Sequence, residues 1–259
     1  MRRLLPLTAL IALLVVATGL TACGDGGETS TSAAESTTAT GSTTESAPEP
    51  EAGDEPIAVA ALGDSITAGT PLWAADAATR DAIGPALDEE SQWEYWAAQE
   101  NPALEFNNCG VNGERTDEVA LRLEECVAGA GPDGADVLIV QGGINDIAQG
   151  APVDDAAENL RAMVQAGLDA GLEVAITDLL PWNNGHPTAD PMVEDLNEQI
   201  AAIAEEEGVA LIPFHVTLED PENPGLMRED WTIEGDHPSV EGYRLLGEQA
   251  VAPNLPGAP

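Results

Sequence analysis

Short apolar runs alternate with longer amphipathic segments over residues 56–259 of this 259-residue chain. Five runs have the length and aliphatic composition of buried strands, and they cover 57–62, 104–108, 136–141, 173–179 and 209–214. Helical periodicity, with an apolar residue every three or four positions, covers 91–100, 116–127, 154–171, 190–208 and 238–251. This alternation is typical of an α/β fold, so we expect one domain around a five-stranded parallel sheet.

The N-terminal pattern is different and indicates export. Residues 1–22 contain two arginines, an apolar stretch and then small residues, which is the pattern of a signal peptide. The letters LTAC at 20–23 resemble the lipobox of bacterial lipoproteins, which implies that Cys23 becomes a lipidated N-terminus. The alternative is ordinary secretory cleavage nearby, with no role for Cys23. We therefore expect the protein on the outer face of the cytoplasmic membrane or secreted.

Residues 23–55 separate this N-terminal signal from the predicted domain. From residue 24 to 55 the chain consists of Gly, Ser, Thr, Ala, Pro and acidic residues, without an aromatic or branched aliphatic side chain. Such a segment cannot bury enough apolar surface to offset the entropy of ordering it. We expect a disordered acidic linker that holds the domain at 56–259 away from a membrane.

The charge of the chain excludes some partners. Its formal net charge is −39, and the basic residues are all arginines. Nucleic acid and anionic bilayers would be repelled, so the only expected membrane contact is the lipid anchor. We interpret the charge as a solvated acidic surface suited to a salty medium, where screening relieves self-repulsion.

Two cysteines remain in the predicted domain once Cys23 is set aside. Cys109 and Cys126 form an even pair in an exported protein, which favours a disulfide between them. Two buried free thiols are the alternative, because the sequence does not reveal the distance between them.

Ligands of parallel α/β sheets collect at the carboxyl ends of the strands, so the residues after each apolar run carry the functional argument. These segments read GDSIT, CGVNGERT, GGINDI, LPWNNGHP and, further along, EGDHPS. Ser65 in the first segment stands where a strand passes into a helix. It is either a helix N-cap or a nucleophile, and the second role requires a base and a group that orients the base.

Three histidines are candidates for that base. His215 follows the last strand and is interpreted as a packed core residue, whereas His186 lies in a loop without an acid at turn spacing before it. His237 has Glu234 three residues earlier across a glycine, a spacing at which side chains meet in a tight turn. Asp236 is the second choice of orienting acid. Its alternative role is to cap the helix that begins near residue 238.

Acyl transfer also needs donors for an oxyanion. Gly113 offers a backbone N–H that a ligand can approach closely, Asn145 offers a side-chain amide, and Ser65 offers its own N–H. Each of these residues taken alone is compatible with an ordinary loop. Their order on consecutive strand ends, followed by an acid and a base, favours a hydrolase.

With these residues in place, the chain resembles the SGNH or GDSL-type serine esterases. The blocks are Gly-Asp-Ser in LGDSIT, the glycine of NGERT, Gly-x-Asn-Asp in GINDI and the histidine of HPSVEGY. The resemblance implies Ser65 as nucleophile, His237 as general base, Gly113 and Asn145 as oxyanion donors, a flavodoxin-like three-layer α/β/α sandwich, and no metal or organic cofactor. Glu234 departs from the aspartate usual in that family.

An α/β-hydrolase fits less well, because its Gly-x-Ser-x-Gly elbow would need glycine where Thr67 stands. We expect a carboxylic-ester hydrolase acting through a serine acyl-enzyme. Expected substrates are small acyl or aryl esters, lysophospholipids or acetylated sugars, and Trp73 and Trp182 are candidate pocket walls or core residues. The alternative is a non-catalytic carbohydrate- or lipid-binding lipoprotein on the same scaffold.

Overall fold

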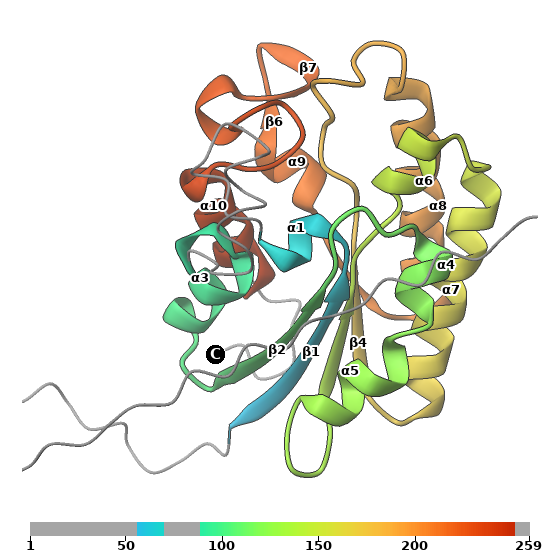
Figure 1. Cartoon of the computed structure of the whole chain (residues 1–259), viewed down its shortest axis with the longest axis vertical. Coiled ribbons are helices and arrows are strands. Elements are labelled where there is room, and N and C mark those ends of the chain that lie inside the picture. Colours follow the sequence, from blue (N-terminus) through green and yellow to red (C-terminus); the bar gives the residue numbers. More distant parts are fainter. Residues whose placement is uncertain (1–55, 70–88, 252–259) are drawn as a thin grey trace, which may run out of the picture. The chain divides into compact units, whose positions relative to one another are not determined.

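The computed structural model describes residues 56–69 and 89–251. Within these residues five parallel strands form one sheet in the order β2-β1-β3-β4-β5 (Figure 1). The strands are β1 (Ile57–Gly63), β2 (Leu104–Gly110), β3 (Val137–Val140), β4 (Glu173–Thr177) and β5 (Ala210–Ile212). Each strand lies at a predicted apolar run, and the order is the doubly wound flavodoxin-like one, so the predicted fold class is confirmed.

Alternating side chains of the strands enter two separate cores. Ala60, Leu138 and Ile176 pack on one side of the sheet, and their neighbours Ala61 and Ile139 pack on the other side. Because both faces of a parallel sheet are covered, its strands are apolar at consecutive positions rather than at every second one. The sequence pattern therefore reports a buried central sheet.

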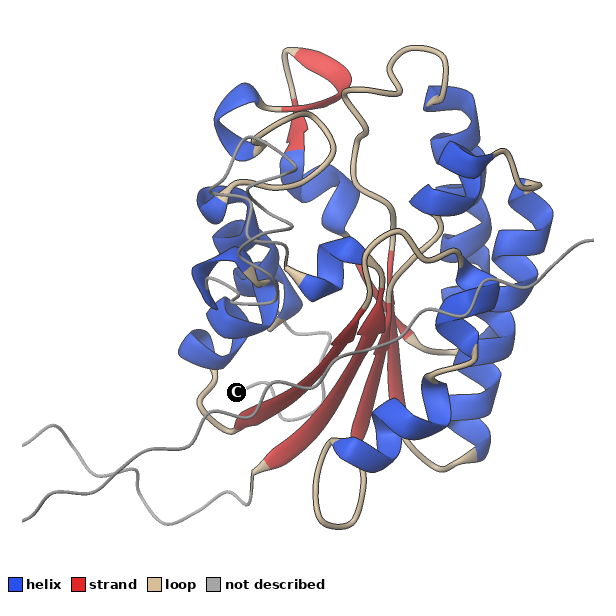
Figure 2. Cartoon of the chain, in the orientation of Figure 1, coloured by secondary structure: helices blue, strands red, loops and turns tan. Residues whose placement is uncertain are grey.

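Helices cover both faces, which gives the three layers visible in Figure 2. One face is covered by α4 (Thr116–Ala120), α5 (Leu123–Gly129), α7 (Val153–Asp169) and α8 (Asp190–Glu207). The other is covered by α3 (Trp93–Glu100), α9 (Phe214–Leu218) and α10 (Val240–Ala250). The shorter helices α1 (Ser65–Ala68) and α6 (Ile144–Gln149) begin at the carboxyl ends of β1 and β3.

The predicted helix at 116–127 is wrong in one respect, because the structure divides it into α4 and α5. At the junction the N–H groups of Leu121 and Arg122 donate to the carbonyls of Glu118 and Val119, three residues back, so the helix tightens there. Periodicity alone misses such a junction. It also misses elements too short for a period: η1 (Glu89–Ser91), η2 (Glu229–Trp231) and the hairpin of β6 (Glu219–Asp220) and β7 (Asn223–Met227).

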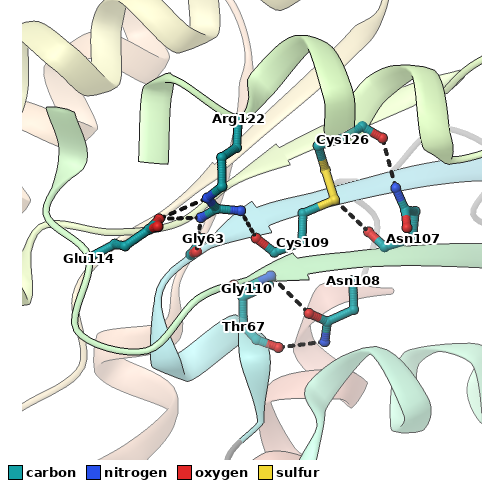
Figure 3. The surroundings of a disulfide bond; sticks show 9 residues. All are labelled: Gly63, Thr67, Asn107, Asn108, Cys109, Gly110, Glu114, Arg122 and Cys126. Carbon is teal, nitrogen blue, oxygen red and sulfur yellow. Dashed lines mark hydrogen bonds and ion pairs between the residues drawn. A yellow bond between two sulfur atoms is a disulfide. The ribbon is translucent and has the colours of Figure 1, made fainter. Parts of the chain in front are cut away.

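A disulfide joins Cys109 near the end of β2 to Cys126 in α5, with their Cα atoms 5.8 Å apart (Figure 3). It therefore fastens a helix of one outer layer to an edge strand of the sheet. The predictions for the signal peptide at 1–22, lipidation of Cys23, the linker at 23–55 and the role of Trp73 lie outside the described residues. In 56–69 and 89–251 no helix is both long and apolar enough to cross a membrane.

Candidate active site

Ser65 is the first residue of α1, directly after the turn that ends β1. The N-cap of α1 is Asp64, whose side chain accepts a hydrogen bond from the Ile66 N–H at 2.9 Å. Ser65 therefore does not have the capping role that was its alternative. Its side chain is largely buried, with 7% of the residue exposed, and its Oγ lies 2.9 Å from Nε2 of His237.

The Gly-Asp-Ser turn is fixed by Gln141, at the end of β3. Its Oε1 accepts hydrogen bonds from the Asp64 N–H at 3.1 Å and from the Thr67 hydroxyl at 2.9 Å. A Cβ on Gly63 would lie 2.3 Å from Thr67 Oγ1 and 2.5 Å from Gln141 Oε1, so only glycine fits there. Burial raises the pKa of the Asp64 carboxyl, although hydrogen bonds from its surroundings partly oppose this.

His237 lies between a hydroxyl and a carboxylate. Its Nε2 faces Ser65, and its Nδ1 makes a very short contact with Oε1 of Glu234. The turn between the acid and the imidazole passes through Gly235, whose φ is +94°. Thr232 holds this turn, because its hydroxyl donates to the His237 carbonyl at 2.8 Å and accepts from the Gly235 N–H at 3.0 Å.

Asp236 has a different set of partners. Its Oδ1 accepts hydrogen bonds from Nε1 of Trp182 at 2.6 Å and from Nδ2 of Asn184 at 2.7 Å. The N-cap of α10 is Ser239, whose hydroxyl accepts from the Gly242 N–H. The structure thus brings Glu234 to the imidazole and turns Asp236 toward Trp182, and it does not use Asp236 as the cap.

The other two histidines lie away from Ser65. His215 Nδ1 is 2.8 Å from the Leu179 carbonyl, which agrees with a histidine satisfied within the fold. His186 Nδ1 is 2.8 Å from Oδ2 of Asp190, an acid that follows it in sequence. Neither imidazole lines the cavity that contains Ser65.

Three hydrogen-bond donors converge beside Ser65. Gly113 has φ +80°, and nothing lies within 4 Å of the position that its Cβ would take, so its backbone is open to a ligand. Asn145 Nδ2 donates to the Glu114 carbonyl at 2.9 Å and keeps only a long 3.5 Å contact with Asp64 Oδ2 for its second hydrogen. Among the described residues, the backbone N–H groups of Ser65 and Gly113 have no acceptor.

A second link holds the loops of these donors together. Asp146, the neighbour of Asn145, accepts hydrogen bonds from the N–H and hydroxyl of Thr116 at 3.0 and 2.8 Å. Burial raises the pKa of the Asp146 carboxyl. Sequence reasoning did not single out Asp64, Gln141 or Asp146. The available signal was position: Asp64 directly follows β1, Gln141 directly follows β3, and Asp146 lies beside Asn145 in the segment GGINDI.

These groups surround one cavity of about 290 Å³. Its lining residues are Ser65, Ile66, Asn112, Gly113, Ile144, Asn145, Ala148, Trp182, Glu234, Asp236 and His237. A hydroxyl, an imidazole, a carboxylate and three N–H donors around one cavity are the parts needed for nucleophilic attack on a carbonyl carbon. In the part of the chain that the structure describes, no group of three or more His, Cys, Asp and Glu side chains is suited to hold a metal ion.

Known proteins resemble this chain in sequence and in fold. Residues 61–245 match the GDSL-like Lipase/Acylhydrolase family. No curated protein is significantly similar to the chain. The solved structures that share the fold include a member of the lipolytic protein G-D-S-L family from Veillonella parvula, a GDSL-like lipase from Bacteroides thetaiotaomicron, and a variant of an acetyl-xylooligosaccharide esterase from Geobacillus Stearmophilus.

The similarity covers most of each protein. Sequence identities to the Veillonella, Bacteroides and Geobacillus proteins are 22%, 20% and 18%, with TM-scores of 0.60, 0.56 and 0.58. Each alignment covers 74% of this chain and, in the same order, 95%, 84% and 91% of the other chain. At these identities the solved structures establish a common fold.

Proposed function

Because the chain belongs to the GDSL-like lipase/acylhydrolase family, we propose that it is a carboxylic-ester hydrolase that acts through an acyl-enzyme on Ser65. The observation that carries the proposal is the 2.9 Å separation of Ser65 Oγ and His237 Nε2, with Glu234 at the other ring nitrogen. A hydroxyl in contact with an oriented base is the general signature of an activated nucleophile.

The first half-reaction forms the acyl-enzyme. His237 Nε2 takes the proton of Ser65 as Oγ attacks the ester carbonyl carbon, and Glu234 accepts the Nδ1–H so that the imidazolium is stabilised. The carbonyl oxygen becomes an oxyanion, to which Ser65 N–H, Gly113 N–H and Asn145 Nδ2 donate. When the tetrahedral intermediate collapses, the alcohol leaves with the proton from His237.

The second half-reaction regenerates the enzyme. Water takes the place of the alcohol and gives a proton to His237 as its oxygen attacks the acyl carbon. The same donors stabilise the second oxyanion. Release of the carboxylic acid returns the proton to Ser65 Oγ, so the net reaction is ester plus water to acid plus alcohol.

For the substrate class we propose small esters, with acetylated sugars as the leading candidates. Two observations support this choice: the cavity is compact, and one of the similar folds is described as an acetyl-xylooligosaccharide esterase. Ile66, Ile144 and Trp182 supply an apolar wall for a short acyl group. The carboxylates of Glu234 and Asp236 and the net charge of −39 disfavour anionic esters.

A fluorophosphonate probe tests the enzyme against the binding-protein alternative. The wild type is expected to be labelled in the folded state, and the Ser65→Ala variant is expected to lose the label. A folded wild type without Ser65-dependent labelling would contradict the proposal and favour a non-catalytic lipoprotein. Acetylated xylan, lysophospholipid and p-nitrophenyl esters of increasing acyl length then identify the preferred ester.

We also propose that the protein is exported and anchored through a lipid on Cys23, on the strength of the sequence at 1–23. The matched test is a Cys23→Ser variant of the full chain expressed in a bacterial host. Radiolabelled palmitate should enter the wild type and not the variant. Equal incorporation into both, or into neither with secretion intact, would contradict lipidation at this residue.

A further inference from the structure

The guanidinium group of Arg122 joins three parts of the molecule that surround the candidate active site (Figure 3). It lies at the junction of α4 and α5 and donates to the carbonyl of Gly63 at 3.0 Å and to the carbonyl of Cys109. On its other side it forms a two-pronged ion pair with Glu114 Oε2, through Nε at 2.8 Å and Nη2 at 2.6 Å. No other arginine among the described residues contacts two strand ends.

The two carbonyls belong to strand ends that carry the site. Gly63 is the last residue of β1 and stands two positions before Ser65, and Cys109 belongs to the neighbouring strand β2, where it pairs with Leu62 of β1. One side chain therefore fixes the end of the nucleophile strand against the end of β2. Neither the Arg122 nor the Glu114 side chain is freely solvated, since they are 23% and 21% exposed. Solvent consequently screens this pair less than it screens an ordinary surface pair.

Glu114 connects this anchor to the oxyanion donors. Its backbone carbonyl accepts the hydrogen bond from Asn145 Nδ2 at 2.9 Å, and its preceding residue is Gly113. Glu114 is thus held at its side chain by Arg122 and at its main chain by Asn145. Movement of Glu114 would displace the Gly113 N–H and release the amide of Asn145 at the same time.

The disulfide holds Arg122 where it makes these contacts. Cys126 is one helical turn after Arg122, and its N–H donates to the Arg122 carbonyl at 2.9 Å. Its sulfur is bonded to Cys109, whose own carbonyl is an acceptor for Arg122. The covalent link and the guanidinium therefore hold the same strand end from two positions that lie one turn apart on one helical segment.

We infer that Arg122 is a positioning residue for the oxyanion hole, acting through Glu114 and supported by the Cys109–Cys126 disulfide. This inference rests on the proposed ester hydrolysis. Arg122 has no contact with the cavity that contains Ser65, so its effect is on the placement of Gly113 and Asn145. Loss of the anchor should slow the chemical step more than it weakens substrate binding, because these donors act mainly on the charge of the transition state.

The first variant is Glu114→Ala, which removes the ion pair and leaves the backbone carbonyl for Asn145. Its matched control is Glu207→Ala at the end of α8. Glu207 is similarly shielded, with 20% of its side chain exposed, and it forms a 3.0 Å ion pair with Arg161 that lies away from the cavity. We expect kcat for p-nitrophenyl acetate to fall by about 10- to 100-fold in Glu114→Ala, with KM changed by less than about 3-fold. The control should keep the kcat of the wild type.

A second arm tests the disulfide. The Cys109→Ser, Cys126→Ser double variant should lower kcat in the same direction while circular dichroism still reports a folded domain. Combined with Glu114→Ala, its effect should be less than the product of the separate effects, because both changes disable one clamp. An effect equal to the product of the separate effects, or larger than it, would overturn the part of the inference that concerns the disulfide.

The outcomes separate the two proposals. If the wild type hydrolyses the ester and Glu114→Ala keeps the kcat of Glu207→Ala, or raises KM alone, Arg122 does not position the oxyanion hole and ester hydrolysis still stands. If the folded wild type neither turns over an ester nor takes a fluorophosphonate on Ser65, the proposed function fails and the inference falls with it.

Discussion

The indole of Trp182 donates its Nε1–H to Asp236 over 2.6 Å, so the acid next to His237 in sequence holds a wall of the cavity and not the imidazole. Adjacent side chains diverge, and here the divergence separates two functions. Glu234, three positions before His237, contacts the ring nitrogen, whereas Asp236 accepts the hydrogen bond of the Trp182 indole.

The first prediction concerns these two acids. Glu234→Ala should lower kcat for p-nitrophenyl acetate by about 10- to 100-fold, because the imidazole loses the group that selects its tautomer and stabilises its charge. Asp236→Ala should lower it by clearly less, since the Glu234 contact remains. Steady-state kinetics of both variants make the comparison, and a larger loss in Asp236→Ala would reverse our assignment.

Trp182 is predicted to limit the length of the acyl group. It also borders a second, small cavity of about 20 Å³, whose lining is mainly apolar and includes Leu179, Leu180 and Phe214. Trp182→Ala should join that space to the active-site cavity, so kcat/KM for p-nitrophenyl hexanoate should rise relative to acetate. Trp96→Ala, which removes an indole that does not line the site, is the control. An unchanged chain-length profile in Trp182→Ala would argue against this role.

Glu94 gives a prediction about stability and pH. It lies in α3 with 3% of its surface exposed, and within the described part of the chain neither carboxylate oxygen has a hydrogen-bond partner. Burial raises the pKa of Glu94 well above its ordinary value of 4.5, so the folded state holds the proton more tightly than the unfolded state. Stability from this group is therefore complete below pH 4.5 and declines as the pH rises toward the folded-state pKa.

The Glu94→Gln variant tests that argument because it keeps the shape without the charge. Its melting temperature should nearly equal that of the wild type near pH 4 and exceed it increasingly toward pH 8. Thermal denaturation across this range measures the difference. Wild type more stable than the variant at pH 8 would mean that ionised Glu94 is stabilised by contacts that its burial does not reveal.

Salt should stabilise the domain. Each described arginine already pairs with a carboxylate; these arginines are Arg115, Arg122, Arg161, Arg228 and Arg244. The formal net charge is nevertheless −39, so most carboxylates repel one another and added ions screen the repulsion. The melting temperature should increase from low to molar NaCl. A flat or falling curve would contradict our interpretation of the acidic composition.

The strands and the principal residues of the candidate site could be predicted from the sequence for physical reasons. The sheet is buried on both faces, so its strands are continuous apolar runs, and the carboxyl ends of those runs are where Ser65, Gly113 and Asn145 stand. The choice of Glu234 over Asp236 followed from turn spacing. It did not require knowledge of Trp182.

What the sequence did not reveal depends on contacts between distant segments. In the sequence Arg122 is one of several polar residues of an amphipathic helix. Nothing in the sequence indicates that it donates hydrogen bonds to carbonyls on β1 and β2. The bond from Trp182 to Asp236 spans 54 positions. The break between α4 and α5 is a local tightening that leaves the apolar periodicity unchanged.

The central claim, that Ser65 and His237 together cleave esters through an acyl-enzyme, is tested most directly by mass spectrometry of acid-quenched reactions with p-nitrophenyl acetate. We predict one acetyl group on the proteolytic peptide that contains Ser65 in the wild type, no acetyl group there in Ser65→Ala, and much slower acetylation in His237→Ala. Turnover of the ester by the folded wild type without acetylation of Ser65, or at an undiminished rate in Ser65→Ala, would contradict the account.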